Sequence, residues 1–284
     1  VTYNEQRDDR FYHRYSYDSE NRLTGVETSI NGELWDEDAT YEYYQHGPLM
    51  RTVIGEDKVQ GIDYAYTIQG WLKAINTAHL ARGRELDIAT NTFKDLTPRA
   101  DGNNVGTTPW ETSNVAKDVY GMTLGYFQGD YRNTSRDYLT ENTQNLYASA
   151  NYKDLYNGNI SFWKNSRLKQ TGSNPIVESN YTNATIYRYD ILNRIKESWN
   201  YERDNSLTLG FKAGYNNNGN AGAFHTNYTY DANGNLLSLN RNNEGGTPMD
   251  ELKYGYYRED PFDNTSRIVN NRLANVVDDV TTAT

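Results

Sequence analysis

The sequence predicts an all-β protein in which repeated β-hairpins form a curved, spiralling antiparallel sheet. Three observations favour this fold class. The segment Tyr228–Leu239 reads as one complete hairpin, the same pattern recurs along the 284 residues, and the chain contains 26 tyrosines. A repeat period of a few tens of residues is typical of architectures in which each unit is completed by its neighbours.

The hairpin at Tyr228–Leu239 gives the pattern its clearest form. Tyr228 and Tyr230 are two residues apart, so in a strand they lie on the same face. Asn233-Gly234 favours a type I′ turn, in which both central residues have φ > 0, and Asp231 can bond the backbone just ahead of it. On the return strand, Leu237 and Leu239 are expected to alternate.

The pattern occurs six times, and each copy begins with a pair of tyrosines. The first tyrosines of the pairs are Tyr15, Tyr41, Tyr64, Tyr187, Tyr228 and Tyr254. In three other copies the turn is expected at Asn21-Arg22, His46-Gly47 and Gln69-Gly70. We interpret residues 1–284 as a single repeat segment, with copies one to three in 1–75 and copies four to six in 186–284. The residues predicted to define the repeat are Tyr15, Tyr17, Asp18, Tyr64, Tyr66, Gly70, Tyr187, Tyr189, Asp190, Tyr228, Tyr230, Asp231 and Gly234.

Residues 76–185 form a divergent insert with hairpins and one long loop. Met122–Tyr126 alternates as a strand would, and a turn is expected at Gln128–Asp130. A strand, an Asn-Gly turn and a second strand are expected over Leu155–Phe162. Short helical segments are expected at Glu141–Tyr152 and near Ala78–Gly83, and the long polar loop at Asp95–Glu111.

Composition excludes several classes of function. Apolar residues make up 36% and the mean hydropathy is −0.93, but a disordered chain would be poor in aromatic residues. Tyrosine buries its ring while its hydroxyl reaches a partner or water, as suits a thin sheet. A net charge of −10 argues against nucleic acid and anionic membrane surfaces, and no apolar run is long enough to span a membrane. The chain begins at Val1 without a methionine, so we expect it to be part of a longer protein.

No catalytic, metal or cofactor site is predicted. The four histidines, His13, His46, His79 and His225, lack neighbours at metal-ligand spacing, and the chain has no cysteine. Asp231, Asn233 and Asn235 imitate the opening of a calcium loop, but the glycine is misplaced and Asn242 stands where a bidentate glutamate is needed. We therefore interpret these residues as turn formers, and acidic clusters such as Asp36–Asp38 as solvated edges.

The segment Tyr230-Asp231-Ala232-Asn233-Gly234-Asn235-Leu236 resembles the YD repeat of the Rhs family. Tyr17-Asp18 with Asn21-Arg22-Leu23, and Tyr189-Asp190 with Asn193-Arg194-Ile195, are close variants. The segment Tyr66–Lys73 is similar to the branch found in large Bacteroidetes surface proteins. In this family, which is related to the Tc toxin cocoon and teneurins, hairpins spiral into a hollow shell.

The resemblance implies a structural shell segment of a large secreted or cell-surface bacterial protein, enclosing or carrying a C-terminal toxin or effector domain. Its implied partners are further repeats or a partner strand at the sheet edges, the enclosed domain, and secretion machinery. The family's sealing, self-cleaving segment is not recognisable, since Asp260-Pro261 lacks a glycine-rich continuation. We therefore expect no enzyme activity in this chain, and the self-cleaving protease is the least supported hypothesis.

A carbohydrate-binding or adhesion module is the alternative. Sugars stack on aromatic faces, and Trp110 in the long polar loop is the candidate contact. Trp71, Trp163 and Trp199 instead fall in predicted strands and are expected to pack between hairpins.

Overall fold

The computed structural model describes residues 2–3, 11–76, 120–131, 144–147, 149–167, 181–204, 210–213, 222–259 and 268–280. Trp110, the predicted loop Asp95–Glu111 and the helical turn near Ala78 lie outside these residues. The described chain is all-β apart from the four-residue helix α1 (Gln144–Tyr147), which falls inside the helix expected at Glu141–Tyr152. This confirms the predicted fold class of antiparallel hairpins. Within the described part, no helix has the length and apolar character needed to cross a membrane.

The chain divides into two compact units. The first comprises Val1–Leu124, Gly129–Thr140 and Asn165–Thr182, and the second Gly125–Gln128, Glu141–Lys164 and Asn183–Thr284. Strands β9 (Phe162–Arg167) and β10 (Tyr181–Tyr189) therefore contribute residues to both units.

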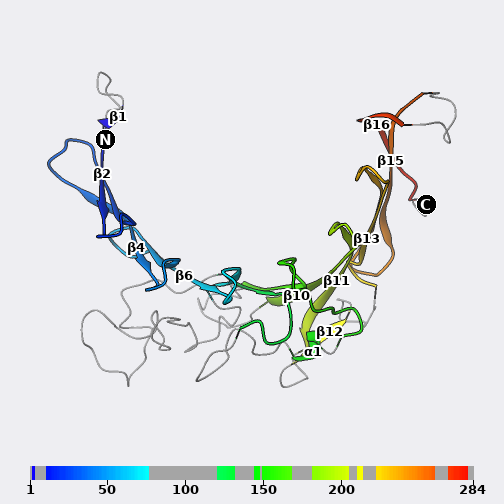
Figure 1. Ribbon diagram of the computed structural model, residues 1–284, viewed down its shortest axis with the longest axis horizontal. Coiled ribbons are helices and arrows are strands. Elements are labelled where there is room, and N and C mark those ends of the chain that lie inside the picture. Colours follow the sequence, from blue (N-terminus) through cyan, green and yellow to red (C-terminus); the bar gives the residue numbers. More distant parts are fainter. Residues whose placement is uncertain are drawn as a thin grey trace, which may run out of the picture. The chain divides into compact units, whose positions relative to one another are not determined.

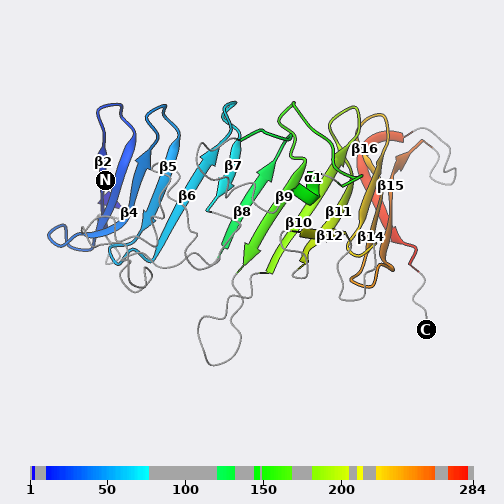
Figure 2. The ribbon, with the colours of Figure 1, turned by 90° about the horizontal axis from the view of Figure 1, so that it is seen from below.

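In the first unit, each strand pairs antiparallel with the next in sequence (Figure 2). The order of the strands is thus their order in the chain, as in a series of joined hairpins. The strands are β1 (Thr2–Tyr3), β2 (Phe11–Tyr17), β3 (Leu23–Ser29), β4 (Asp36–Tyr43), β5 (Leu49–Ile54), β6 (Gln60–Tyr66), β7 (Leu72–Ile75) and β8 (Tyr120–Gly125). The last of these matches the strand predicted at Met122–Tyr126.

The second unit continues the same design. Strand β11 pairs with β10, and its other edge is shared by β12 and β13. Strands β13, β14, β15 and β16 then follow in order, and α1 lies beside β12 (Figure 1). The strands are β9 (Phe162–Arg167), β10 (Tyr181–Tyr189), β11 (Ile195–Asp204), β12 (Gly210–Ala213), β13 (Thr226–Tyr230), β14 (Leu236–Asn242), β15 (Pro248–Arg258) and β16 (Ile268–Asp278).

Each hairpin that begins with a tyrosine pair carries a β-bulge immediately after its turn. In the β13–β14 hairpin, Tyr230 lies opposite Leu236, whereas Thr229 lies opposite Ser238, so that Leu237 has no opposite residue. Leu239 lies opposite Tyr228, so the bulge changes the pairing of Leu237 but not that of Leu239. The same shift lies between the second tyrosine and the residue before it in the hairpins of Tyr17, Tyr43, Tyr66, Tyr189 and Tyr256.

The turn also differs from the predicted type. Only Gly234 has positive φ (91°), and its N–H donates to the carbonyl of Asp231, while the Asp231 N–H donates to the carbonyl of Asn235. These bonds define a three-residue loop with one left-handed residue, not a type I′ turn. Asn21 (φ 60°) therefore corresponds to Gly234, and Arg22 to Asn235. Asparagine and glycine fill this position because they tolerate the left-handed region best.

Successive hairpins join in a constant register. The third residue of each return strand pairs with the residue just before the next tyrosine pair. The pairs are Gly25 with Thr40, Arg51 with Asp63, Glu197 with Asn227, and Ser238 with Lys253. Every such junction therefore places the next tyrosine pair beside the preceding bulge.

The hairpin predicted over Leu155–Phe162 is only partly present. Gly158 has the positive φ of a turn (86°), and Phe162 begins β9, but Leu155 and Tyr156 are not in a strand. The N–H of Leu155 instead donates to the carbonyl of Tyr126, so this segment packs against the end of β8.

The larger hydrophobic cluster lies in the second unit. Leu146, Phe162, Ala184, Ile186 and Tyr201 form its buried part, and Tyr147, Tyr152 and Trp199 pack against it. In the first unit, Ala65 and Ala74 are buried beneath Tyr131. Both hydrophobic clusters are small for the length of the described sheet. Polar contacts between hairpins therefore contribute much of the stability of the sheet.

Candidate functional site

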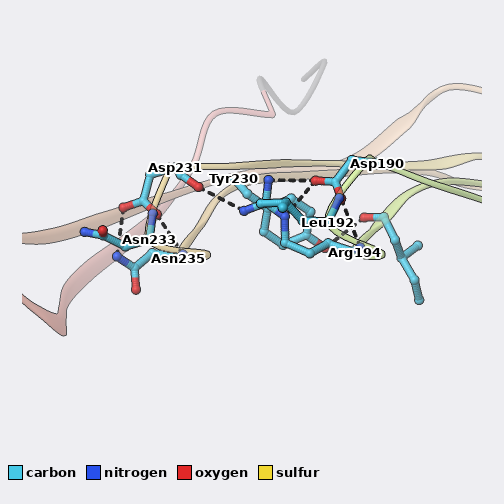
Figure 3. A network of polar contacts seen from close by, with 8 residues as sticks. Asp190, Leu192, Arg194, Tyr230, Asp231, Asn233 and Asn235 are labelled. Carbon is cyan, nitrogen blue, oxygen red and sulfur yellow. Dashed lines mark hydrogen bonds and ion pairs between the residues drawn. The ribbon is translucent and has the colours of Figure 1, made fainter.

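A polar arrangement that recurs in three hairpins begins with an aspartate at the turn. Oδ1 of Asp190 accepts hydrogen bonds from the N–H groups of Leu192 (2.8 Å) and Arg194 (3.0 Å), and Oδ2 pairs with Arg194 Nε at 2.6 Å (Figure 3). A carboxylate that accepts N–H groups two and four residues ahead holds the loop in its turn conformation. We call this arrangement the aspartate turn.

Two further hairpins repeat it. Oδ1 of Asp231 accepts the N–H groups of Asn233 (2.9 Å) and Asn235 (2.8 Å), and Oδ2 accepts Asn235 Nδ2 at 2.8 Å (Figure 3). Asp18 makes the same contacts with Glu20 and Arg22, including an Arg22 Nε bond of 2.7 Å. Both carboxylate oxygens of Asp231 are engaged in the turn, which supports turn formation over calcium binding.

In four hairpins, the second tyrosine of the pair donates a hydrogen bond to the segment that precedes the hairpin in the sheet. The hydroxyl of Tyr230 donates to the carbonyl of Ile195, the first residue of the preceding return strand, at 2.8 Å. A bulge interrupts the ladder at this carbonyl, so the hydroxyl supplies a bond that the regular strand would have provided. We call this hydrogen bond the tyrosine clamp. It also joins Tyr43 to Leu23 (2.8 Å) and Tyr256 to Leu236 (3.0 Å). The hydroxyl of Tyr189 donates in a similar way to the carbonyl of Ile160 (2.9 Å), which lies outside a strand, two residues before β9.

An arginine reinforces the clamp in two hairpins. The guanidinium of Arg194 lies over the ring of Tyr230, 4.6 Å from its centroid, and Nη1 donates to the carbonyl of Asp231 at 2.9 Å. Arg22 likewise lies 4.7 Å from the centroid of Tyr43. A cation over an aromatic face adds attraction to the hydrogen bonds. The arginine thus belongs to one aspartate turn and holds the next hairpin.

The surroundings shift the pKa values of these groups. Hydrogen bonds from the backbone and side chain of Arg22 hold the pKa of Asp18 below its ordinary value of 3.8. For Asp190, desolvation is the largest influence and acts to raise the pKa, but the bonds from Arg194 and Leu192 together lower it. Desolvation, with a smaller contribution from Tyr187, raises the pKa of Tyr189 to about 12. The Tyr189 hydroxyl therefore remains a hydrogen-bond donor at neutral pH.

The predicted repeat residues do not form one site. Each pair lies at the end of its own strand: Tyr15 and Tyr17 on β2, Tyr64 and Tyr66 on β6, Tyr187 and Tyr189 on β10, and Tyr228 and Tyr230 on β13. Gly70 occupies the left-handed turn position with φ 82°. Instead, the structure brings together residues of neighbouring hairpins. The sequence analysis did not identify Arg22 and Arg194, which make these contacts. Their signal was the recurring Asp-x-x-x-Arg spacing.

Sequence reasoning also missed two buried ion pairs in the first unit. Lys73 Nζ lies 2.7 and 2.8 Å from the carboxylate oxygens of Asp130, and both side chains are fully buried. Arg51 and Asp63, opposite each other on β5 and β6, are paired at 2.5 Å. The described residues contain no cluster of three or more metal-ligating side chains.

The tryptophans occupy different settings. Trp199 lies on β11, against the larger hydrophobic cluster and 5.1 Å from the ring of His225. Trp163 lies on β9, as predicted. Trp71 was predicted to lie in a strand, but it directly precedes β7 and is outside it. Trp110 lies outside the described residues, so the glycan contact stays a prediction.

Neither a family model nor a curated protein matches the chain. Among solved structures, it is similar to a crystal structure of TcdB2-TccC3-Cdc42, with 14% identity and a TM-score of 0.19. A crystal structure of TcdB2-TccC3 without its hypervariable C-terminal region gives 15% identity and a TM-score of 0.20. Each comparison covers 95% of this chain but only 14% of the other.

Proposed function

We propose that the chain is a structural segment of an Rhs-type YD-repeat shell, whose work is to extend a wall of hairpins. The observation that carries the proposal is the tyrosine clamp, which at Tyr43, Tyr230 and Tyr256 joins one hairpin to the bulge of the preceding hairpin. The residues of the YD motif form the aspartate turn, the tyrosine clamp and the contacts of the arginine that lies over the clamp tyrosine. Their pattern is therefore explained by joining hairpins, with no need for a substrate.

The proposal gives the segment a place in a larger protein. The shell would belong to a large secreted or surface-exposed bacterial protein of the Bacteroidetes type and would enclose or carry a C-terminal toxin or effector domain. The segment itself would act as a scaffold without catalysing a reaction. The support is that the aspartates and tyrosines of the motif are engaged with the backbone of the turns and bulges.

Limited proteolysis of the full-length protein tests this function. An enclosed downstream domain should resist protease in the wild type and become accessible in the double variant Arg194→Ala/Tyr230→Phe, which removes one clamp and the arginine that lies over it. Tyr228→Phe, in the same strand, is the matched control and should preserve protection. A downstream domain that is cleaved equally fast in all three proteins would overturn the enclosing function.

A further inference from the structure

Tyr156 is the most exposed tyrosine of the described chain, with 69% of its surface open to solvent. It belongs to none of the tyrosine pairs and lies outside the strands, so neither the sheet nor the tyrosine clamp uses its ring. One face of the ring packs on Phe127, with 4.7 Å between the ring centroids and 30° between the planes. The opposite face of Tyr156 is therefore an open aromatic surface.

Two backbone donors hold the segment that carries Tyr156 in place. The N–H of Leu155 donates to the carbonyl of Tyr126 at 2.8 Å, and the N–H of Gln128 donates to Oδ1 of Asp154 at 2.7 Å. All of these residues belong to the second compact unit. Because both chain segments behind the stacked rings are fixed, a ligand on the open face costs little conformational freedom.

Amide side chains adjoin this aromatic surface. Asn157 follows Tyr156 directly, and its Nδ2 donates to Oδ1 of Asn193 at 2.8 Å, while Nδ2 of Asn159 donates to the same oxygen at 3.0 Å. Asn193 belongs to the aspartate turn of Asp190 (Figure 3), and its exposed Nδ2 has no acceptor among the described residues. The amide group of Asn193 is thus positioned by two bonds to its oxygen and keeps two N–H donors for a ligand.

We propose that this surface, the Tyr156 platform, binds a neutral oligosaccharide. One pyranose ring stacks on the open face of Tyr156, and its hydroxyls accept hydrogen bonds from the Asn193 amide. A pyranose with equatorial hydroxyls offers a flat C–H face that matches an aromatic ring, and tyrosine provides such a contact at a low cost in side-chain entropy. Asp154 and the net charge of −10 disfavour acidic sugars. This activity is separate from the proposed structural role and does not depend on it.

Saturation-transfer NMR titration of the whole chain with cellotetraose tests the proposal, because every glucose ring of this probe is neutral with equatorial substituents. Tyr156→Ala should weaken binding about tenfold, since the aromatic contact is lost, whereas Tyr156→Phe should retain it. Tyr257→Ala is the matched control. Tyr257 is also exposed (44%), but the guanidinium of Arg272 lies over its ring at 5.0 Å, so this variant should bind like the wild type.

Asn193→Gly tests the polar half of the platform. Glycine accepts the left-handed backbone of Asn193 (φ 62°), so the turn is kept while the amide is removed. Binding should weaken about fivefold, the effect of one neutral hydrogen bond. Circular dichroism confirms that each variant is folded.

Two further probes define the class of ligand. The tetramer of β-1,4-linked glucuronic acid has the same linkage as cellotetraose but carries carboxylates, and it should bind more weakly. Ile191 and Leu192 are exposed on the turn of Asn193, so the dye bis-ANS probes for an unspecific apolar patch. Tyr156-dependent dye binding without cellotetraose binding would overturn the proposal in favour of such a patch.

Three other results would also overturn it: a wild type that does not bind cellotetraose, a Tyr156→Ala protein that binds it equally well, or an acidic tetramer that binds as tightly as the neutral one. Each of these results would leave untouched the protease protection that tests the proposed structural function.

Discussion

The hydroxyl of Tyr230 and the carbonyl of Ile195, 2.8 Å apart, join two hairpins that are separated by 35 residues. The carbonyl is available because a bulge follows it, and the hydroxyl reaches it because Tyr230 ends its strand. The tyrosine of the turn motif therefore also forms a contact with the neighbouring hairpin.

Removing this hydroxyl should loosen the junction locally. Tyr230→Phe keeps the ring beneath Arg194 but leaves the carbonyl of Ile195 without its donor. We expect a loss of about 1 kcal/mol, the net value of one hydrogen bond. Hydrogen exchange should accelerate about fivefold in β11 and β13. The control Tyr228→Phe should exchange like the wild type, and equal acceleration in both variants would contradict a specific role for the clamp.

Acid should weaken the aspartate turns. The pKa of Asp190 in the folded protein lies below its ordinary value of 3.8, so its charged form stabilises the fold above that pH. This stabilisation is lost as the pH falls from about 3.8 through the lowered pKa. Asp190→Asn lacks the titrating group, so its stability deficit against the wild type should be largest at neutral pH and shrink on acidification. A deficit in the urea midpoint that is constant between pH 7 and pH 3 would contradict the assignment.

The sequence predicted the hairpins well because their signals are local. Tyrosines two residues apart, an aspartate, and a glycine or asparagine at the turn all lie within a dozen residues, as at Tyr228–Leu239. The predicted turn type is wrong because it followed the type I′ preference of the Asn233-Gly234 dipeptide. In the structure, Asp231 binds the N–H groups of Asn233 and Asn235, and this favours a loop with one left-handed residue.

Contacts between hairpins escaped prediction because their partners are distant in sequence. Arg194 reaches the carbonyl of Asp231, 37 residues away, and Lys73 pairs with Asp130, 57 residues away. No periodicity in one chain specifies which acid meets Lys73. The bulge could not be predicted from the sequence, because the apolar residues Leu236, Leu237 and Leu239 are compatible with a strand with or without a bulge.

Gly125 should tolerate no side chain. A Cβ at this position would overlap the ring of Phe162, which is fully buried in the larger hydrophobic cluster. We expect Gly125→Ala to destabilise the protein by about 1–3 kcal/mol, the usual cost of overpacking. Gly255→Ala is the matched control, because the added methyl group meets only the end of the Asn275 side chain, which is exposed and can move. Urea unfolding curves that rank the two variants equally would contradict this packing.

Breaking the buried ion pair should have the largest effect of the four changes. Lys73→Met leaves the carboxylate of Asp130 buried without its bidentate partner, at a cost of about 3–5 kcal/mol. The double variant Lys73→Met/Asp130→Leu removes both charges and should regain most of that loss, since a buried pair stabilises little over apolar residues of similar size. Urea unfolding of the single and double variants measures the coupling between the two residues. Arg14→Met, which breaks the exposed pair of Arg14 with Glu27, should barely move the midpoint. If the stability losses of Lys73→Met and of Asp130→Leu alone simply added in the double variant, the direct pairing of Lys73 with Asp130 would be refuted.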